Sequence, residues 1–154
     1  MQTIKYKRLK INKLGEIKLL WEDLNDNHLK DSIYFKEHYT TYSFEKRSAG
    51  WLKLPKKNFH LLIAETKDLV IIGYCVSTID ENWKGEIDSL YIKPEFRQQG
   101  IGKTTLNKSF QWLQIYHCKP IQLSVSYGHE SVIGFYQKLG YYPKFTTLEW
   151  IVFE

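Results

Sequence analysis

Apolar and polar residues change period several times along the chain, and each change predicts a secondary-structure element. Apolar side chains recur at three- and four-residue steps over 14–28, which predicts an amphipathic helix that begins near Asn12. Alternation predicts a short first strand over 3–9. Two apolar runs joined by a polar turn, 59–64 and 69–78, predict an antiparallel hairpin.

The rest of the chain mixes helical and strand periods in the same way. Glycine or proline punctuates the end of most of these segments. The further elements that we expect are a helix over 32–54, a strand over 86–92, a helix over 100–117, a strand over 121–126, a helix over 131–139 and a last strand over 146–153. With no repeat or linker, these elements predict a single mixed α/β domain over 1–154.

Composition narrows the class of protein. The chain is 43% hydrophobic and 25% charged, as is ordinary for a globular fold, whereas 16% aromatic residues is high and predicts a core or pocket built from rings. The 22 basic and 17 acidic residues leave a net charge of +5. Because the basic residues are scattered, a polyanionic small molecule fits this charge better than nucleic acid.

Location and metal content follow from what the sequence lacks. Cys75 and Cys118 form no CxxC and no framework of spaced pairs, so a reduced cytoplasmic location is expected. The N-terminus has no signal-peptide pattern, and no apolar run approaches the ~18 residues that span a bilayer, so no membrane partner is expected. No His/Cys/Asp cluster has metal-ligand spacing, and we expect no metal.

The segment 84–106 predicts an anion site. A strand ends at Pro94, and Gly100 and Gly102 open a helix, so unpaired N–H groups and the positive end of the helix dipole are expected to converge there. The run Gly102-Lys103-Thr104 imitates the end of a P-loop. Arg97 stands where that motif needs its first glycine, which argues against ATP or GTP.

Two separated motifs in this half of the chain carry a resemblance. The run RQQGIG over 97–102 resembles the Arg/Gln-x-x-Gly-x-Gly/Ala signature of GCN5-related N-acetyltransferases (the GNAT family). The segment 124–143, which contains FYQKLGY, resembles the family's strand-five-to-helix-four region. The likeness covers residue 59 to the C-terminus, and residues before Lys57 agree only in coarse pattern.

The resemblance implies a fold and a co-substrate. The fold is a GNAT-like central mixed, mostly antiparallel twisted sheet of six to seven strands flanked by about four helices, with strands four and five splayed around acetyl-CoA. The acceptor-side helices would occupy about 12–54 and the acetyl-CoA-binding core about 59–143. The implied cofactor-binding residues are Leu90, Tyr91, Ile92, Arg97, Gln98, Gln99, Gly100, Ile101, Gly102, Lys103, Thr104, His129 and Tyr136.

Within that set the roles differ. The amides of 98–103 would hold the pyrophosphate, and Arg97 would add charge. Backbone N–H groups over 90–92, at a bulge in the fourth strand, would bond the thioester carbonyl and the pantetheine arm. His129 stands where the family usually has asparagine, so its contact with the pantetheine is a departure from the pattern.

The resemblance also implies two catalytic residues. Tyr136 matches the family tyrosine near the sulfur, where a phenol would give a proton to the departing thiolate. A core role stays open for Tyr136, which shares a helical stripe with Val132 and Leu139. Glu86 matches a glutamate that acts as a base through water in some members, and Asp88 lies on the same strand face by period two. A solvated acid is the alternative for both.

The acceptor is expected to be an amine of a small molecule, peptide or protein, bound by the parts of the chain that differ most within the family. The candidates are Trp21, Asn25, His28, Tyr34, Phe35 and Tyr127. Such an aromatic wall would hold an amine by cation–π contact or pack an apolar acceptor. An acetyl-CoA-dependent N-acetyltransferase, monomeric or homodimeric, is the prediction. The alternatives are a catalytically idle acyl-CoA-binding or sensor module of the same fold, and a basic nucleic-acid-binding domain.

Overall fold

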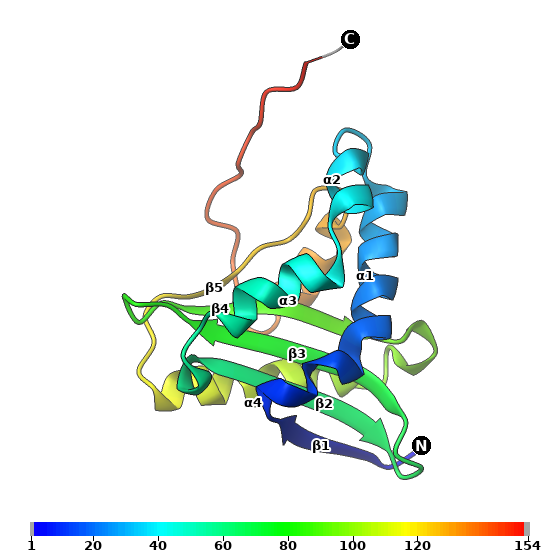
Figure 1. Cartoon of the computed structure of the whole chain (residues 1–154), viewed down its shortest axis with the longest axis vertical. Helices are drawn as coiled ribbons and strands as arrows, with labels where there is room; N and C mark the ends of the chain where they lie inside the picture. The colour runs from blue at the N-terminus through cyan, green and yellow to red at the C-terminus, as the bar shows by residue number, and fades with distance from the viewer. Residues whose placement is uncertain (1, 153–154) are drawn as a thin grey trace.

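A twisted sheet with helices on both faces forms the protein in this computed structural model, which describes residues 2–152 (Figure 1). The strands lie in the sheet in the order of the sequence, and the first four are antiparallel while the fifth runs parallel to the fourth. They are β1 (Ile4–Leu9), β2 (Phe59–Thr66), β3 (Ile71–Ile79), β4 (Gly85–Ile92) and β5 (Ile121–Leu123).

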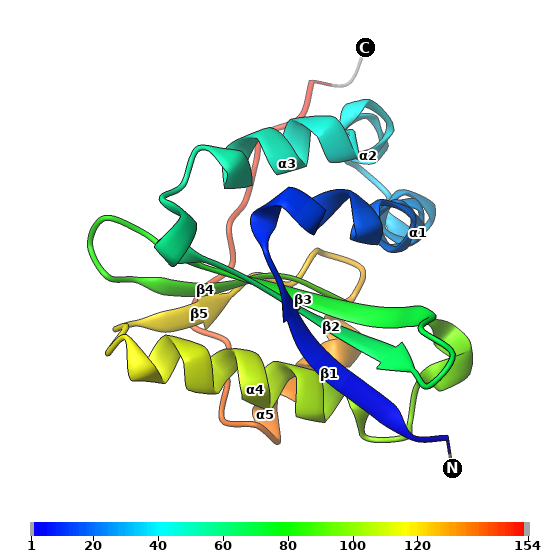
Figure 2. The ribbon, with the colours of Figure 1, turned by 60° about the horizontal axis from the view of Figure 1, so that its bottom comes forward.

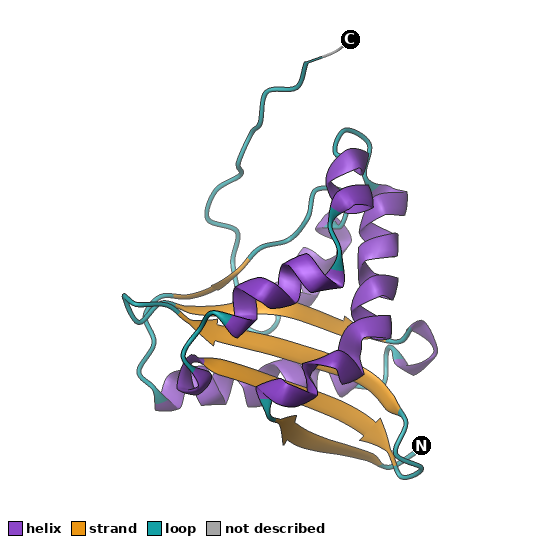
Figure 3. Cartoon of the chain, in the orientation of Figure 1, coloured by secondary structure: helices purple, strands orange, loops and turns teal. Residues whose placement is uncertain are grey.

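Helices cover the two faces unequally. Helices α1 to α3 lie over one face and α4 and α5 over the other, as Figure 2 shows. The helices are α1 (Lys18–Asp31), α2 (Lys36–Thr41), α3 (Phe44–Leu52), α4 (Ile101–Ile115) and α5 (Ile133–Gln137). Short 3-10 turns, drawn as helix in Figure 3, are η1 (Ile11–Ile17), η2 (Lys56–Asn58), η3 (Pro94–Phe96) and η4 (Glu130–Val132).

Each face of the sheet has its own hydrophobic core, because alternate strand residues point to opposite sides. Under α1 and α3 the core includes Ile17, Trp51 and Tyr74, and under α4 it includes Cys75 and Leu106. Every residue of β2 is buried, including the polar His60, Glu65 and Thr66, so both faces of this strand are covered.

Strand β4 carries a bulge beside the place where β5 leaves it. Val76 of β3 lies opposite Ser89, and Ser77 lies opposite Ile87, so Asp88 is the extra residue. Strand β5 pairs with β4 only from Gly85 to Ile87. Beyond that point the β5-facing edge of β4 has no strand partner among the described residues, and its backbone groups are available to a ligand.

These observations confirm the expected fold class, including the splayed fourth and fifth strands, with four corrections. Five strands are described, against the six to seven expected. The expected helix over 32–54 is two helices, because the chain is extended at Tyr42 and Ser43, whose hydroxyl accepts from the Lys46 N–H and begins α3. The first long helix is preceded by the turn η1 rather than starting near Asn12.

The fourth correction concerns the C-terminal segment. Residues 146–152 of the expected last strand form no strand, and Phe153 lies outside the described residues. The segment runs away from the sheet (Figure 1), with Leu148 and Trp150 91% and 84% exposed. Alternation gives a strand only where a sheet edge pairs with it, and here none does.

Among residues 2–152, no helix has the length and apolar character to cross a membrane.

A buried histidine makes the stability of this fold depend on pH. His60 of β2 is buried and stacks on Trp112 of α4, with ring centroids 4.8 Å apart. Burial, and then the nearby Arg8, lower the pKa of His60 to about 4. The neutral form is therefore the one that the folded state favours, whereas the unfolded chain takes up a proton at about pH 6.5.

We therefore expect the free energy of unfolding to fall as the pH drops from about 6.5 to about 4. In His60→Phe, which keeps a ring against Trp112, this fall should shrink by on the order of 2 kcal/mol. Urea unfolding at pH 7 and pH 4.5 measures it. His28 has a similarly lowered pKa, so some fall should persist. Parallel pH dependences in the two proteins would contradict the assignment to His60.

Candidate active site

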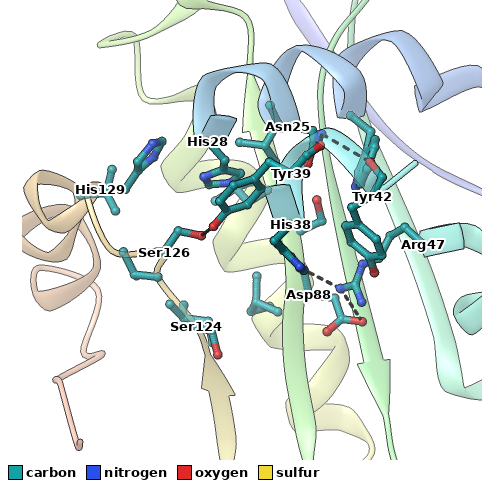
Figure 4. Close-up of a pocket in the computed structure, with 18 of the residues that line it drawn as sticks. Asn25, His28, His38, Tyr39, Tyr42, Arg47, Asp88, Ser124, Ser126 and His129 are labelled. Atoms are coloured by element: carbon teal, nitrogen blue, oxygen red, sulfur yellow. Dashed lines mark hydrogen bonds and ion pairs between the residues drawn. The ribbon is translucent and has the colours of Figure 1, made fainter. Parts of the chain in front are cut away.

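A cavity of about 440 Å³ lies where β4 and β5 part, under α1 and α2 (Figure 4). Its floor comes from the two strands, one wall from the helices, and its far end from the segment around η4 and α5. The lining residues are Trp21, Leu24, Asn25, His28, His38, Tyr39, Tyr42, Arg47, Ile87, Asp88, Ser89, Leu90, Leu123, Ser124, Val125, Ser126, His129, Val132 and Tyr136.

The carboxylate of Asp88 lies at the β4 bulge and is held by three donors. Trp51 Nε1 donates to Oδ2 at 2.9 Å, Thr78 Oγ1 donates at 3.3 Å, and Arg47 Nη2 lies 3.5 Å away. The Arg47 guanidinium also lies 4.8 Å from the Trp51 ring centroid. All three contacts reach the same oxygen, so Oδ1 has no partner among the described residues and is free to bind a ligand.

Glu86 lies two residues earlier on the same strand, outside the residues that line the cavity. Burial, and then the neighbouring Asp88 charge, raise the pKa of its half-buried carboxyl. Lys84 Nζ lies 4.0 Å from its Oε2 and opposes that rise. A raised pKa suits a general base. Of the two carboxylates, however, Asp88 is the one that lines the cavity.

Tyr136 reaches the cavity from α5. Burial raises the pKa of its phenol to about 12, so the group is protonated throughout the neutral range. Its ring packs against Phe135 at 5.1 Å and Tyr141 at 6.2 Å between centroids, in the apolar cluster under α4. The hydroxyl thus keeps its proton at the cavity margin, and burial makes it a weaker acid than an exposed tyrosine.

The predicted anion loop precedes α4. Gln98 and Gly100 have φ angles of 60° and 78°, and the Gly100 carbonyl accepts the Thr104 N–H at 3.0 Å. The N–H groups before Thr104 belong to the first helical turn, where no intrahelical acceptor exists. Arg97 is held to the strand end, because its Nε donates to the Ile92 carbonyl at 2.8 Å.

Ring side chains gather at the other side of the cavity. His28 stacks on Tyr39 at 5.4 Å between centroids, and the His129 ring lies 4.5 Å from that of His28. His129 Nε2 is 3.0 Å from an Asp31 carboxylate oxygen, so this side chain faces α1. Burial, and then His129, lower the pKa of His28 to about 4, and its Nδ1 has no partner among the described residues.

Comparison with known proteins identifies the family. The sequence profile of the acetyltransferase (GNAT) family matches residues 19–141. This chain is a member of the GNAT family. An uncharacterized N-acetyltransferase of Pyropia yezoensis is 25% identical to it over 131 residues, which are 72% of this chain and 74% of that protein.

Solved GNAT structures share the fold. A GCN5-related N-acetyltransferase from Ralstonia eutropha superposes with a TM-score of 0.77 at 16% identity, over 97% of this chain and 99% of that one. The PaiA N-acetyltransferase from Thermoplasma acidophilum, in complex with coenzyme A, gives 0.72 at 25% identity, over 94% and 93% of the two chains.

In this GNAT protein the predicted acceptor residues divide into two groups. Trp21 and His28, with the neighbouring Asn25, line the cavity. Tyr34, Phe35 and Tyr127 lie outside it: Tyr34 and Tyr127 are exposed, and Phe35 lies in the loop between α1 and α2. The acceptor roles of all six candidates stay predictions.

Sequence reasoning missed several residues that line the cavity. They are His38, Tyr39, Tyr42, Arg47, Ser124 and Ser126. The aromatic density over 34–44 was the available signal for the first three, whereas nothing local marks Arg47, which meets Asp88 across 41 residues of chain.

Among residues 2–152, no three His, Cys, Asp or Glu side chains are grouped as a metal site.

The two loop glycines differ in what they tolerate. A Cβ on Gly102 would lie 3.7 Å from Ile92 Cγ1 and from Phe135 Cζ, which is ordinary contact, whereas Gly100 has the left-handed φ that L-residues avoid. Gly100→Ala should therefore lower the free energy of unfolding by about 1–2 kcal/mol. Gly102→Ala should leave it unchanged or raise it by up to about 1 kcal/mol, since alanine suits a helix better. Equal losses in urea unfolding would contradict this distinction.

Proposed function

We propose that this GNAT protein transfers the acetyl group of acetyl-CoA to a primary amine bound in the cavity. The observation that carries the proposal is the parting of β4 from β5, which opens a cavity lined by residues of β4 and by the single carboxylate of Asp88. The coenzyme A bound by the relative from T. acidophilum supports the choice of co-substrate.

The chain offers a fitting set of groups for the co-substrate. The N–H groups over 98–103 at the start of α4 would hold the pyrophosphate, with Lys103 and Thr104 beside them. The free backbone edge over 90–92 would pair with the pantetheine arm, as a strand edge pairs with an extended chain. Arg97, held at Ile92, would add positive charge without leaving its place.

The transfer needs three groups from the protein. Asp88 accepts a hydrogen bond from the amine and takes its proton as the nitrogen–carbon bond forms. Backbone N–H groups near Leu90 stabilise the oxyanion of the tetrahedral intermediate. Tyr136 gives its proton to the sulfur as the carbon–sulfur bond breaks and takes back, through water, the proton that Asp88 holds. The amide and the free thiol are released, and both side chains are restored. We assign the carboxylate role to Asp88 because it lines the cavity and Glu86 does not.

Ligand binding and turnover test this proposal separately. Acetyl-CoA at ~100 times its dissociation constant should add about 2.7 kcal/mol to the free energy of unfolding, seen as a rise in melting temperature. Gly100→Ala, whose Cβ meets no protein atom within 4 Å and so stands on the open side of the loop, should lose most of that rise, whereas Gly102→Ala, at the position where the signature admits alanine, should keep it. Free-thiol release with a panel of amines then separates an enzyme from an idle acyl-CoA-binding module. No thermal shift with acetyl-CoA would overturn the proposal.

Paired substitutions separate the two carboxylates. Asp88→Asn should lower kcat/KM by about 10²-fold or more, since a general base contributes about 10²–10⁴-fold. Glu86→Gln should change kcat/KM less than about threefold. Both variants should keep the acetyl-CoA thermal shift. If Glu86→Gln gives the larger loss, Glu86 is the base, as the sequence alone predicts.

A further inference from the structure

The helical wall of the cavity is a continuous row of rings from three different segments, which we call the ring wall. Its members, in order, are His129, His28, Tyr39, His38, Tyr42 and Trp21. Neighbouring centroids along the row are 4.5, 5.4, 5.0, 5.2 and 5.9 Å apart. Figure 4 shows the labelled rings in this row above Asp88 and Ser124.

Hydrogen bonds fix the ring wall in place. Tyr39 donates from its hydroxyl to Ser126 Oγ at 3.2 Å, which ties α2 to the segment after β5. Asn25 Nδ2 donates to the Tyr39 carbonyl at 2.8 Å, which ties α2 to α1. The row is therefore formed before a ligand arrives, and little side-chain entropy is lost on binding.

The charged side chains that line the cavity indicate which ligand charge it can bind. Arg47 and Asp88 are the charged residues of its lining when histidine is neutral, and they pair with each other at 3.5 Å. His28 stays neutral, because burial and then His129 lower its pKa and Asp31 alone opposes them, while Tyr39 stacks on its ring. The cavity thus has no net negative charge with which to hold a polycation, and its one cation is already paired.

We propose that the acceptor is a monoamine on a flat aromatic body, with the body against the ring wall and the amine at the free oxygen of Asp88. This inference rests on the proposed function for which group reacts. The rings attract an aromatic guest by offset or edge contact, and the ammonium beside it is attracted by the Asp88 carboxylate, so each part of such a ligand has a partner in the cavity. A polyamine or an aminoglycoside would make a favourable contact only through the one amine that Asp88 binds, because it has no aromatic body to pack against the ring wall.

The test measures binding apart from turnover. Calorimetry on the complex with coenzyme A should give 2-phenylethylamine about tenfold tighter binding than 2-cyclohexylethylamine, which has the same length and charge without a π face. Spermidine and tobramycin should bind more weakly than 2-phenylethylamine despite their higher charge. Tighter binding of either polycation, or equal binding of the phenyl and cyclohexyl amines, would overturn the inference.

Two substitutions of Tyr39 test whether the ring wall causes the preference for the phenyl amine. Tyr39→Phe and Tyr39→Leu both remove the bond to Ser126, and only the first keeps a ring. The phenyl preference should survive in Tyr39→Phe and disappear in Tyr39→Leu; survival in both would overturn the role of the ring wall. A preference for the phenyl amine without thiol release would support the aromatic monoamine as ligand and contradict the proposed acetyl transfer. Thiol release together with tighter binding of the polycations would support acetyl transfer and contradict the aromatic monoamine as ligand.

Discussion

The early parting of β5 from β4 is the constraint on which the rest of the structure depends. The two strands share a ladder of three residues, from Gly85 to Ile87, and the bulge at Asp88 follows at once. A bulge adds twist and bend to the strand that carries it, so β4 turns away where β5 ends. The cavity, the free strand edge and the approach to α4 all exist because this pairing stops.

The bulge is stabilised from the other side of the cavity by α3. The Asp88 side chain is only 13% exposed, and burying an unpaired carboxylate costs several kcal/mol. The Trp51 and Arg47 contacts offset that cost, and both come from α3. The residue that we assign to the chemistry is therefore also the one that joins α3 to the sheet, so fold and site share one set of contacts.

The sequence predicted the parts of this arrangement that local patterns encode. The hairpin of β2 and β3 follows from two apolar runs, and the loop from Arg97 to Thr104 follows from its glycines and the helix that they open. These features depend on neighbours in the chain, so alternation and turn chemistry suffice to find them. The family resemblance then supplied the splay of the sheet, which no local pattern contains.

The remaining features depend on contacts between distant residues. Trp51 meets Asp88 across 37 residues, and neither position differs locally from an ordinary helix or strand residue. Glu86 and Asp88 share a strand face by period two, and only the bulge and the position of α3 bring one of them to the cavity. The alternating segment 146–152 predicted a strand, but a strand needs a partner edge that sequence periodicity does not supply.

Helix α2 combines two properties that seldom occur together. It contributes His38 and Tyr39 to the cavity, yet none of its six residues is buried. Substitutions at exposed positions usually change stability by less than about 0.5 kcal/mol. Five of these residues are exposed, and Tyr39, which bonds to Ser126, is half-buried. The side chains that this short helix presents to the cavity can therefore change at little cost to folding at every position except Tyr39.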